Sequence, residues 1–296
     1  MHREMPKNET RRRIQRVSKR CLLKRVGSVA LLSGVSPLLW AAFVEPFRPI
    51  VERVSVRLRD LPPAFDGLRV ALLSDIHLQT GFDTDQLAPA LAHLEREQPD
   101  LVLLLGDYVD GRLANKVSYI ARCAEAFASV RAPLGTFAIF GNHDYPEPPA
   151  DPDSGPWRAA HIRPLHGEAV ELWRGSDRLF LVGLRSLLSR PAYPKEIMHP
   201  LPPDACRIVL WHEGDWAPQT AALGASLQVS GHTHGGQVRM PFFGPPFLPR
   251  AGRLFISGLY RVGEMPLYVT RGVGLLAPRV RFNCPPEVTI LTLRTS

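Results

Sequence analysis

Residues 101–110, LVLLLGDYVD, contain the pattern on which the fold prediction depends. Five apolar residues in a row are typical of a strand that is buried on both faces. The run ends at Gly106, and two carboxylates, Asp107 and Asp110, follow directly. The stretch therefore predicts a central strand whose carboxyl end carries acidic side chains.

The segments on both sides of this stretch repeat the pattern. Residues 68–74 and 136–140 are further apolar runs. Between the runs, residues 84–98 and 117–130 have the apolar spacing of amphipathic helices. Alternation of strands and helices predicts an α/β fold with a parallel sheet that has helices on its faces.

The second half of the chain has less helix between its apolar runs, which favours a second, mixed sheet. Five runs are expected to be strands: residues 179–184, 207–211, 227–229, 267–270 and 288–293. Residues 145–158 and 190–204 are rich in Pro, Asp and Ser and are expected to be loops. Residues 51–58 alternate apolar and polar positions, as a half-buried strand does. We expect one domain over residues 46–296.

Five polar motifs each follow an apolar run. They are Asp75-Ile76-His77, Asp107-Tyr108-Val109-Asp110, Asn142-His143-Asp144, His212, and His232-Thr233-His234. Any one of them alone is more typical of a turn, a helix cap or a buried core residue. Together they contain five of the ten histidines, and open α/β sheets place their sites at strand ends. The five motifs therefore predict one shared site.

The residue types in these motifs suit a pair of metal ions. Asp75 and His77 are two residues apart, so in extended chain both would face one cation. The carboxylate of Asp107 has two oxygens and can bridge two cations about 3.5–4 Å apart. His232 and His234 can each approach a different cation. Nitrogen and oxygen ligands without thiolate favour Mn, Fe or Zn over Ca or Mg.

The amino-terminal segment has a different composition. Ten of the 36 Lys and Arg residues, but only two of the 28 acidic residues, lie in residues 1–25. This leaves 26 of each sign in the rest of the chain, so the body is neutral and no nucleic-acid partner is predicted. Residues 26–44 carry no charge and, as a helix, would span about 28 Å.

We interpret residues 1–45 as a basic arm followed by a transmembrane or signal helix. Cations before an apolar run orient membrane segments with the cations in the cytoplasm. A cleaved signal peptide, a twin-arginine signal at residues 10–14 and a buried core helix are the alternatives. The four cysteines form no close pair, so they indicate neither a zinc ribbon nor a disulfide framework.

In their order and spacing, the five motifs resemble those of the calcineurin-like metallophosphoesterase family over residues 66–295. The ending, with residues 268–274 and 281–287, is similar to a bacterial branch whose members often carry an amino-terminal membrane segment or export signal. The resemblance implies a four-layer αββα sandwich with two mixed β-sheets. His212 is followed by Glu213-Gly214-Asp215 where many relatives have a proline-containing turn, so the shape of that loop is expected to differ.

The resemblance also implies a role for each site residue. Asp75, His77 and His234 would bind one metal ion, Asn142, His212 and His232 the other, and Asp107 both. The metal ions would activate water to attack phosphorus. His143 would then assist the leaving oxygen, with Asp144 orienting its ring.

The expected function is metal-dependent hydrolysis of a phosphodiester or pyrophosphate bond. The substrate would be lipid-linked or nucleotide-linked, as UDP-2,3-diacylglucosamine is for some members of this branch, or a water-soluble ester. The expected location is the bacterial inner membrane, with a single amino-terminal anchor and the body on the periplasmic side. A cytoplasmic body, export with cleavage, and a non-catalytic protein-binding scaffold on the same fold are the alternatives. The oligomeric state is open.

Overall fold

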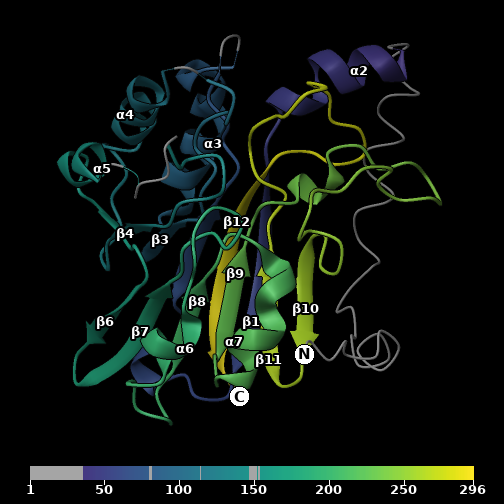
Figure 1. The fold of residues 1–296 in the computed structure, drawn as a ribbon. Helices are drawn as coiled ribbons and strands as arrows, with labels where there is room; N and C mark the ends of the chain where they lie inside the picture. Colours follow the sequence, from purple (N-terminus) through teal and green to yellow (C-terminus); the bar gives the residue numbers. More distant parts are fainter. Residues whose placement is uncertain (1–35, 80–81, 114, 147–151, 153) are drawn as a thin grey trace.

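The computed structural model describes residues 36–296 except 80–81, 114, 147–151 and 153. Two six-stranded sheets form the centre of the molecule (Figure 1). The strands of the first sheet, in spatial order, are β1 (Ile50–Leu58), β12 (Glu287–Thr295), β2 (Arg69–Leu73), β3 (Leu101–Leu104), β4 (Thr136–Ala138) and β5 (Ile162–Pro164). The strands of the second sheet are β10 (Gly258–Val262), β11 (Met265–Val269), β9 (Leu227–Ser230), β8 (Arg207–Leu210), β7 (Asp177–Gly183) and β6 (Glu168–Arg174).

Both sheets are mixed, as predicted. In the first sheet β2, β3, β4 and β5 are parallel, while β12 pairs antiparallel with β2 and parallel with β1. In the second sheet β7, β8, β9 and β11 are parallel, and the edge strands β6 and β10 run antiparallel to their neighbours. The parallel strands of each sheet therefore end at a common edge, where their loops meet.

Three apolar clusters hold the layers together. Alternate residues of β2 belong to different clusters: Val70 and Leu72 lie in the cluster shared by both sheets, while Ala71 and Leu73 pack under helices. The third cluster covers the opposite face of the second sheet. The helices are α3 (Thr84–Glu97), α4 (Lys116–Ala126) and α5 (Gly155–Ala159) over the first sheet, and α6 (Pro194–Met198) and α7 (Ala217–Ala222) over the second. The layers thus run helices, sheet, sheet, helices, in the order that the resemblance implied.

Short elements account for most differences from the sequence prediction. Helices α5 and α6 lie inside the two segments expected to be loops, and strands β5, β6 and β10 were not expected. Within the described part of the chain, the 3₁₀ turns are η2 (Glu45–Phe47), η3 (Pro63–Phe65), η4 (Gly214–Trp216) and η5 (His234–Gly236).

Most of the uncharged stretch 26–44 lies outside the described residues. Its last part forms α2 (Pro37–Phe43), which packs on the body: the carbonyl of Ala41 accepts a hydrogen bond from the Arg281 amide at 2.9 Å. The Glu45 carboxylate, directly after α2, accepts one from the Cys284 amide at 2.6 Å. Within the part of the chain that the structure describes, no helix combines the length and the apolar character needed to cross a bilayer. The predicted anchor therefore stays a prediction.

Candidate metal centre

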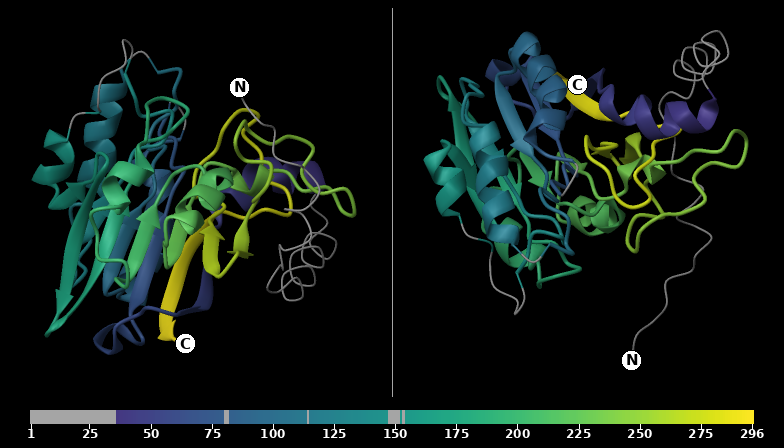
Figure 2. Two further views of the ribbon diagram at one scale, coloured as in Figure 1. Left: turned by 60° about the horizontal axis from the view of Figure 1, so that its bottom comes forward. Right: turned by 90° about the horizontal axis from the view of Figure 1, so that it is seen from above.

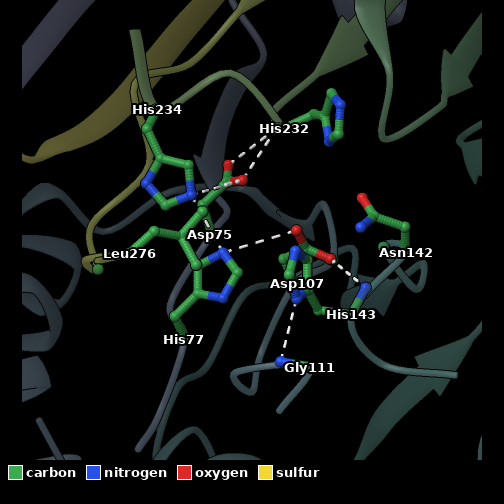
Figure 3. A network of polar contacts seen from close by, with 12 residues as sticks. Asp75, His77, Asp107, Gly111, Asn142, His143, His232, His234 and Leu276 are labelled. Atoms are coloured by element: carbon green, nitrogen blue, oxygen red, sulfur yellow. Dashed lines mark hydrogen bonds and ion pairs between the residues drawn. The ribbon is translucent and has the colours of Figure 1, made fainter. Parts of the chain in front are cut away.

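The five polar motifs meet in one buried place between the carboxyl ends of the central strands (Figure 3). Their side chains form two groups in which the candidate ligand atoms all lie within 4.8 Å of one another. One group is Asp75, His77 and His234, and the other is Asp107, His212 and His232. All six side chains are buried. Each group contains one carboxylate and two imidazoles, a donor set that suits a transition metal ion.

Asp107 connects the two groups through a single oxygen. Its Oδ2 lies 3.0 Å from His212 Nε2 and 3.5 Å from His77 Nε2, so it faces one ring of each group. The other oxygen, Oδ1, accepts a hydrogen bond from the His143 amide at 2.9 Å. This amide holds the carboxylate in place and leaves Oδ2 as the atom able to touch both cations.

Hydrogen bonds to the far side of two rings decide which nitrogen faces the site. His212 Nδ1 lies 2.7 Å from the Leu105 carbonyl, and His232 Nε2 lies 2.7 Å from the Arg250 carbonyl. A carbonyl can only accept, so these nitrogens carry the protons. In the neutral form of each ring, the opposite nitrogen carries no proton and can bind a metal ion.

The polar atoms of the second group that face the site are arranged to bind a cation. His232 Nδ1 and Asn142 Oδ1 are buried and have no hydrogen-bond partner among the described residues, and His212 Nε2 faces only the Asp107 carboxylate. Figure 3 places Asn142 and His232 on the side of Asp107 away from His77 and His234. Buried polar atoms are rarely left unpaired, and a shared cation would satisfy all three.

The spacing of the nitrogens in the first group also fits a cation. The Nε2 atoms of His77 and His234 lie 3.0 Å apart, and His234 Nε2 lies 3.5 Å from Asp75 Oδ1. Two nitrogens bound to one cation at about 2.1 Å and at about a right angle would be about 3.0 Å apart. Together with the second group, this spacing supports a site for two metal ions.

Burial keeps most of these imidazoles in the form that binds metal. It lowers the pKa of His77 to about 3 and that of His232 to about 4, and it holds the pKa of His234 well below its usual range. At His212, burial acts in the same direction, but the carboxylates of Asp107, Asp75 and Glu213 together outweigh it and raise the pKa. Burial raises the pKa of the Asp75 carboxyl to about 7. A metal ion must therefore displace protons from His212 and Asp75 but none from the other three rings.

The backbone at the site is locally unusual. Asp75, His77, Asp107, His232 and His234 all have positive φ, between 50° and 70°. Such angles are uncommon outside glycine and often mark functional sites. Asp75 and His77 thus belong to one ligand group although their chain is not extended, contrary to our expectation. The reason is that their amides bond to the carbonyls of Gly106 and Asp107 in the neighbouring loop at 2.9 and 3.0 Å, which turns the chain after β2.

Two glycines in the motifs allow the loops to approach each other. A Cβ at Gly141 would lie 2.1 Å from Asp107 Oδ1, and a Cβ at Gly231 would lie 2.5 Å from Asp75 Oδ2. Any side chain at these positions would displace a predicted metal ligand.

His143 is half-buried at the edge of this centre, and its ring is held by a backbone group. The Gly111 amide donates to His143 Nδ1 at 3.0 Å. Because Nδ1 accepts, the proton of the neutral ring is on Nε2. His143 is therefore arranged to donate a hydrogen bond from Nε2.

Asp144 does not have the role that the resemblance suggested. Its carboxylate accepts three backbone hydrogen bonds of 2.8 Å, from Gly141, Asp107 and Tyr108, and the side chain is buried. The prediction that Asp144 orients the His143 ring is therefore corrected: Gly111 contacts the ring, and Asp144 joins the loops after β3 and β4. Three backbone amides, from its own loop and the adjacent loop, donate hydrogen bonds to the carboxylate.

A comparison with protein-family models matches residues 68–236 to the calcineurin-like phosphoesterase model, which is more than half of the chain. The chain belongs to the calcineurin-like phosphoesterase family. Membership makes it a metal-dependent phosphohydrolase and agrees with a centre for two metal ions.

Several curated phosphoesterases are similar over most of their length. The phosphodiesterase YaeI of Escherichia coli is 34% identical, covering 76% of this chain and 82% of YaeI. The uncharacterized metallophosphoesterase YkuE of Bacillus subtilis is 28% identical, covering 87% of this chain and 90% of YkuE. The UDP-2,3-diacylglucosamine pyrophosphatase LpxG of Chlamydia muridarum is 26% identical, covering 90% of this chain and 97% of LpxG.

Backbone groups complete this phosphoesterase site, and the sequence reasoning missed them. The amide of Gly111 and the carbonyls of Leu105 and Arg250 orient three of the five histidine rings of the site. Every residue has an amide or a carbonyl, so residue type gives no signal for Leu105 or Arg250. For Gly111 the sequence does offer a signal, because a glycine follows the acidic motif residue Asp110 directly. The structure explains the glycine: a Cβ there would lie 2.4 Å from His143 Nδ1.

Proposed function

We propose that this phosphoesterase hydrolyses a phosphodiester or pyrophosphate bond, using two metal ions held by Asp75, His77, Asp107, Asn142, His212, His232 and His234. The observation that carries the proposal is Asp107 Oδ2, a single buried oxygen that faces one histidine of each ligand group. Mn, Fe or Zn fits the nitrogen and oxygen donors. When bound, the two ions supply a hydroxide nucleophile and neutralise charge on the phosphate oxygens.

The residues of the chain divide the remaining work. Asp107 would contribute a ligand to both ions, and the His143 amide fixes the orientation of its carboxylate. His143 donates a hydrogen bond from Nε2 to a phosphate oxygen or to the leaving oxygen, because Gly111 occupies Nδ1. Asp144 holds the loops that present Asp107 and His143 at a fixed spacing.

The proposed substrate is lipid-linked or nucleotide-linked, of the same class as UDP-2,3-diacylglucosamine. The names of two relatives support a diester or pyrophosphate: YaeI is named a phosphodiesterase and LpxG a UDP-2,3-diacylglucosamine pyrophosphatase. We also propose attachment to the inner membrane through the amino-terminal segment, with the body in the periplasm. The ten cations before an uncharged run support this orientation.

A substrate panel on the full chain tests the proposal. Purified protein would be stripped with a chelator and reconstituted separately with Mn, Fe and Zn. Each preparation would be assayed on a nitrophenyl phosphodiester, a nitrophenyl phosphomonoester, a nucleotide sugar and UDP-2,3-diacylglucosamine. We expect metal-dependent turnover that is faster on the diester or a pyrophosphate than on the monoester.

Asp107→Asn is the matched control, because it keeps the shape of the side chain and removes the bridging charge. Folded, metal-loaded wild-type protein that is inert on all four substrates would refute the enzymatic proposal. Such a result would favour a binding scaffold instead.

A further inference from the structure

Large apolar side chains that face solvent are concentrated at one end of the molecule. Of the twelve among the described residues, nine belong to residues 38–47 or 240–254. Phe242, Phe243 and Phe247 are at least 84% exposed. Single exposed apolar residues are normal, but a concentration of this kind marks an interaction surface.

The two segments lie side by side. Residues 281–283 connect them: the Arg281 amide bonds to the Ala41 carbonyl of α2 at 2.9 Å, and the Arg239 amide bonds to the Phe282 carbonyl at 2.8 Å. Figures 1 and 2 show α2 and the long loop after η5 at the same end of the molecule in every view. We call α2 together with residues 240–254 the apolar end.

The tip of the apolar end is a hairpin closed by backbone hydrogen bonds. Met240 and Gly244 exchange two backbone hydrogen bonds of 2.9 Å, and Phe242 at the turn has a φ of 69°. A bulky residue at positive φ is unfavourable, and so is an exposed phenylalanine in water. Pro245 fixes the base of the hairpin against Gly236, where a Cβ would lie 2.2 Å from the proline. The chain thus holds a strained, exposed aromatic tip in a fixed position.

The loop that carries this tip is also fixed to the metal centre. His232 Nε2 contacts the Arg250 carbonyl at 2.7 Å, and the Thr233 hydroxyl donates to the Ile256 carbonyl at 2.5 Å. Anything that binds the tip is therefore held beside the centre. Exposed cationic side chains lie in or next to the same segments of the chain: Arg48, Arg250, Arg253 and, two residues before Arg281, Arg279.

Apolar side chains with cations in or next to the same segments match the surface of an anionic lipid bilayer. The sequence next to α2 points to the same occupant, since α2 is the last part of the uncharged run 26–44 and follows the basic arm. We propose that the apolar end inserts Phe242, Phe243 and Phe247 into the headgroup and acyl boundary of an anionic bilayer, which holds the metal centre at the membrane surface. This inference goes beyond the proposed function and does not depend on it.

A local probe tests the inference without interference from the amino-terminal segment. Cys123, Cys206 and Cys284 are buried, so Cys21→Ser leaves a background in which an introduced cysteine can be labelled selectively. Phe243→Cys would carry a polarity-sensitive fluorophore at the tip. Trp173→Cys, at an exposed aromatic position on β6 away from the apolar end, is the matched control.

Both labelled full-length proteins would be added to phosphatidylcholine and phosphatidylglycerol vesicles, with and without brominated acyl chains. We expect a blue shift and quenching by bromine at position 243 and neither at position 173. Adding Phe242→Ser to the Phe243→Cys protein should remove most of the quenching. Its thermal unfolding and its hydrolysis of a soluble diester should stay unchanged, because the tip touches no ligand.

Two results would overturn the inference. One is a probe at position 243 that behaves like the probe at position 173 while the protein sediments with the vesicles. The other is protein that does not associate with anionic vesicles at all. A docking site for another protein would give the first or the second result, since pure lipid offers no such partner.

Discussion

Replacing Asp144 by asparagine separates a structural role from a ring-orienting one. The carboxylate accepts amide bonds from Gly141 and Asp107 at Oδ2 and from Tyr108 at Oδ1, each 2.8 Å long. The amide of Asn has only one accepting oxygen. In its best orientation the oxygen keeps the Gly141 and Asp107 bonds, and the Tyr108 amide then faces an NH₂ group.

The cost follows from these three contacts. One buried donor left unpaired costs about 1–3 kcal/mol, and two charge-assisted bonds that become neutral lose about 1 kcal/mol each. Burial raises the pKa of the Asp144 carboxyl to about 7, so removing its charge recovers part of that loss. We expect Asp144→Asn to lower the free energy of unfolding by about 2 kcal/mol. For a chain of 296 residues, whose unfolding entropy is about 0.6 kcal/mol/K, that lowers the melting temperature by about 3 °C.

The measurement is thermal unfolding at pH 8, where Asp144 is ionised, together with kcat on a nitrophenyl phosphodiester. His143→Gln is the comparison variant: it should lower kcat by about 10²–10⁴ and leave the melting temperature nearly unchanged. If Asp144 oriented the His143 ring, Asp144→Asn would match His143→Gln in both quantities. A melting temperature within about 1 °C of wild type would refute the structural role.

Four further predictions follow from the same geometry. Asp107→Ala should lower the content of both metal ions together, as measured by elemental analysis; loss of one ion alone would contradict the shared oxygen. Adding Mn to the metal-free chain at about 100 times its Kd should stabilise the fold by about 2.7 kcal/mol per ion, which differential scanning fluorimetry would detect as a rise of several degrees. Burial raises the pKa of Asp75 to about 7, and a protonated carboxyl must lose its proton before it binds a metal ion. Mn affinity should therefore increase at least about tenfold per pH unit as the pH rises toward 7, and calorimetry should detect proton release on binding. Arg281→Met should lower the free energy of unfolding in urea by about 3–5 kcal/mol, because the buried guanidinium donates to four backbone carbonyls, of which, among the described residues, Gly272 alone keeps a second donor, the Glu287 amide. A loss below about 1 kcal/mol would contradict this.

The central strands were predictable because burial on both faces leaves a direct record in the sequence. Strand β3 (Leu101–Leu104) is fully buried, and its apolar run has no polar interruption. The strands that were missed lie at sheet edges: β5 and β6 alternate buried and exposed positions over short lengths, and β10 begins at Gly258. Edge strands are specified by their neighbours more than by their own composition.

The candidate site was also predictable only in part. The side chains that would touch metal were predictable from residue type and order, and the structure brings six of them into two groups. The contacts that orient them were not predictable, because Leu105, Arg250 and Gly111 act through backbone atoms from distant loops. Asp144 was misassigned for the same reason, since its partners are amides up to 37 residues away.

The hydrogen bonds between the loops show how the centre is kept in shape before any metal ion binds. The Asp75 carboxylate accepts a hydrogen bond from the His232 amide, and this bond joins the first ligand group to the second. The Asp107 carboxylate accepts a hydrogen bond from the His143 amide. Each carboxylate is thus fixed by the backbone of another motif while an oxygen remains directed at the imidazoles. Because the amide donors are fixed by the fold, they can also hold the five ligand residues at their unfavourable positive φ. A metal ion entering this centre needs little rearrangement of the chain, so the cost of organising the ligands is met by folding and not by metal binding.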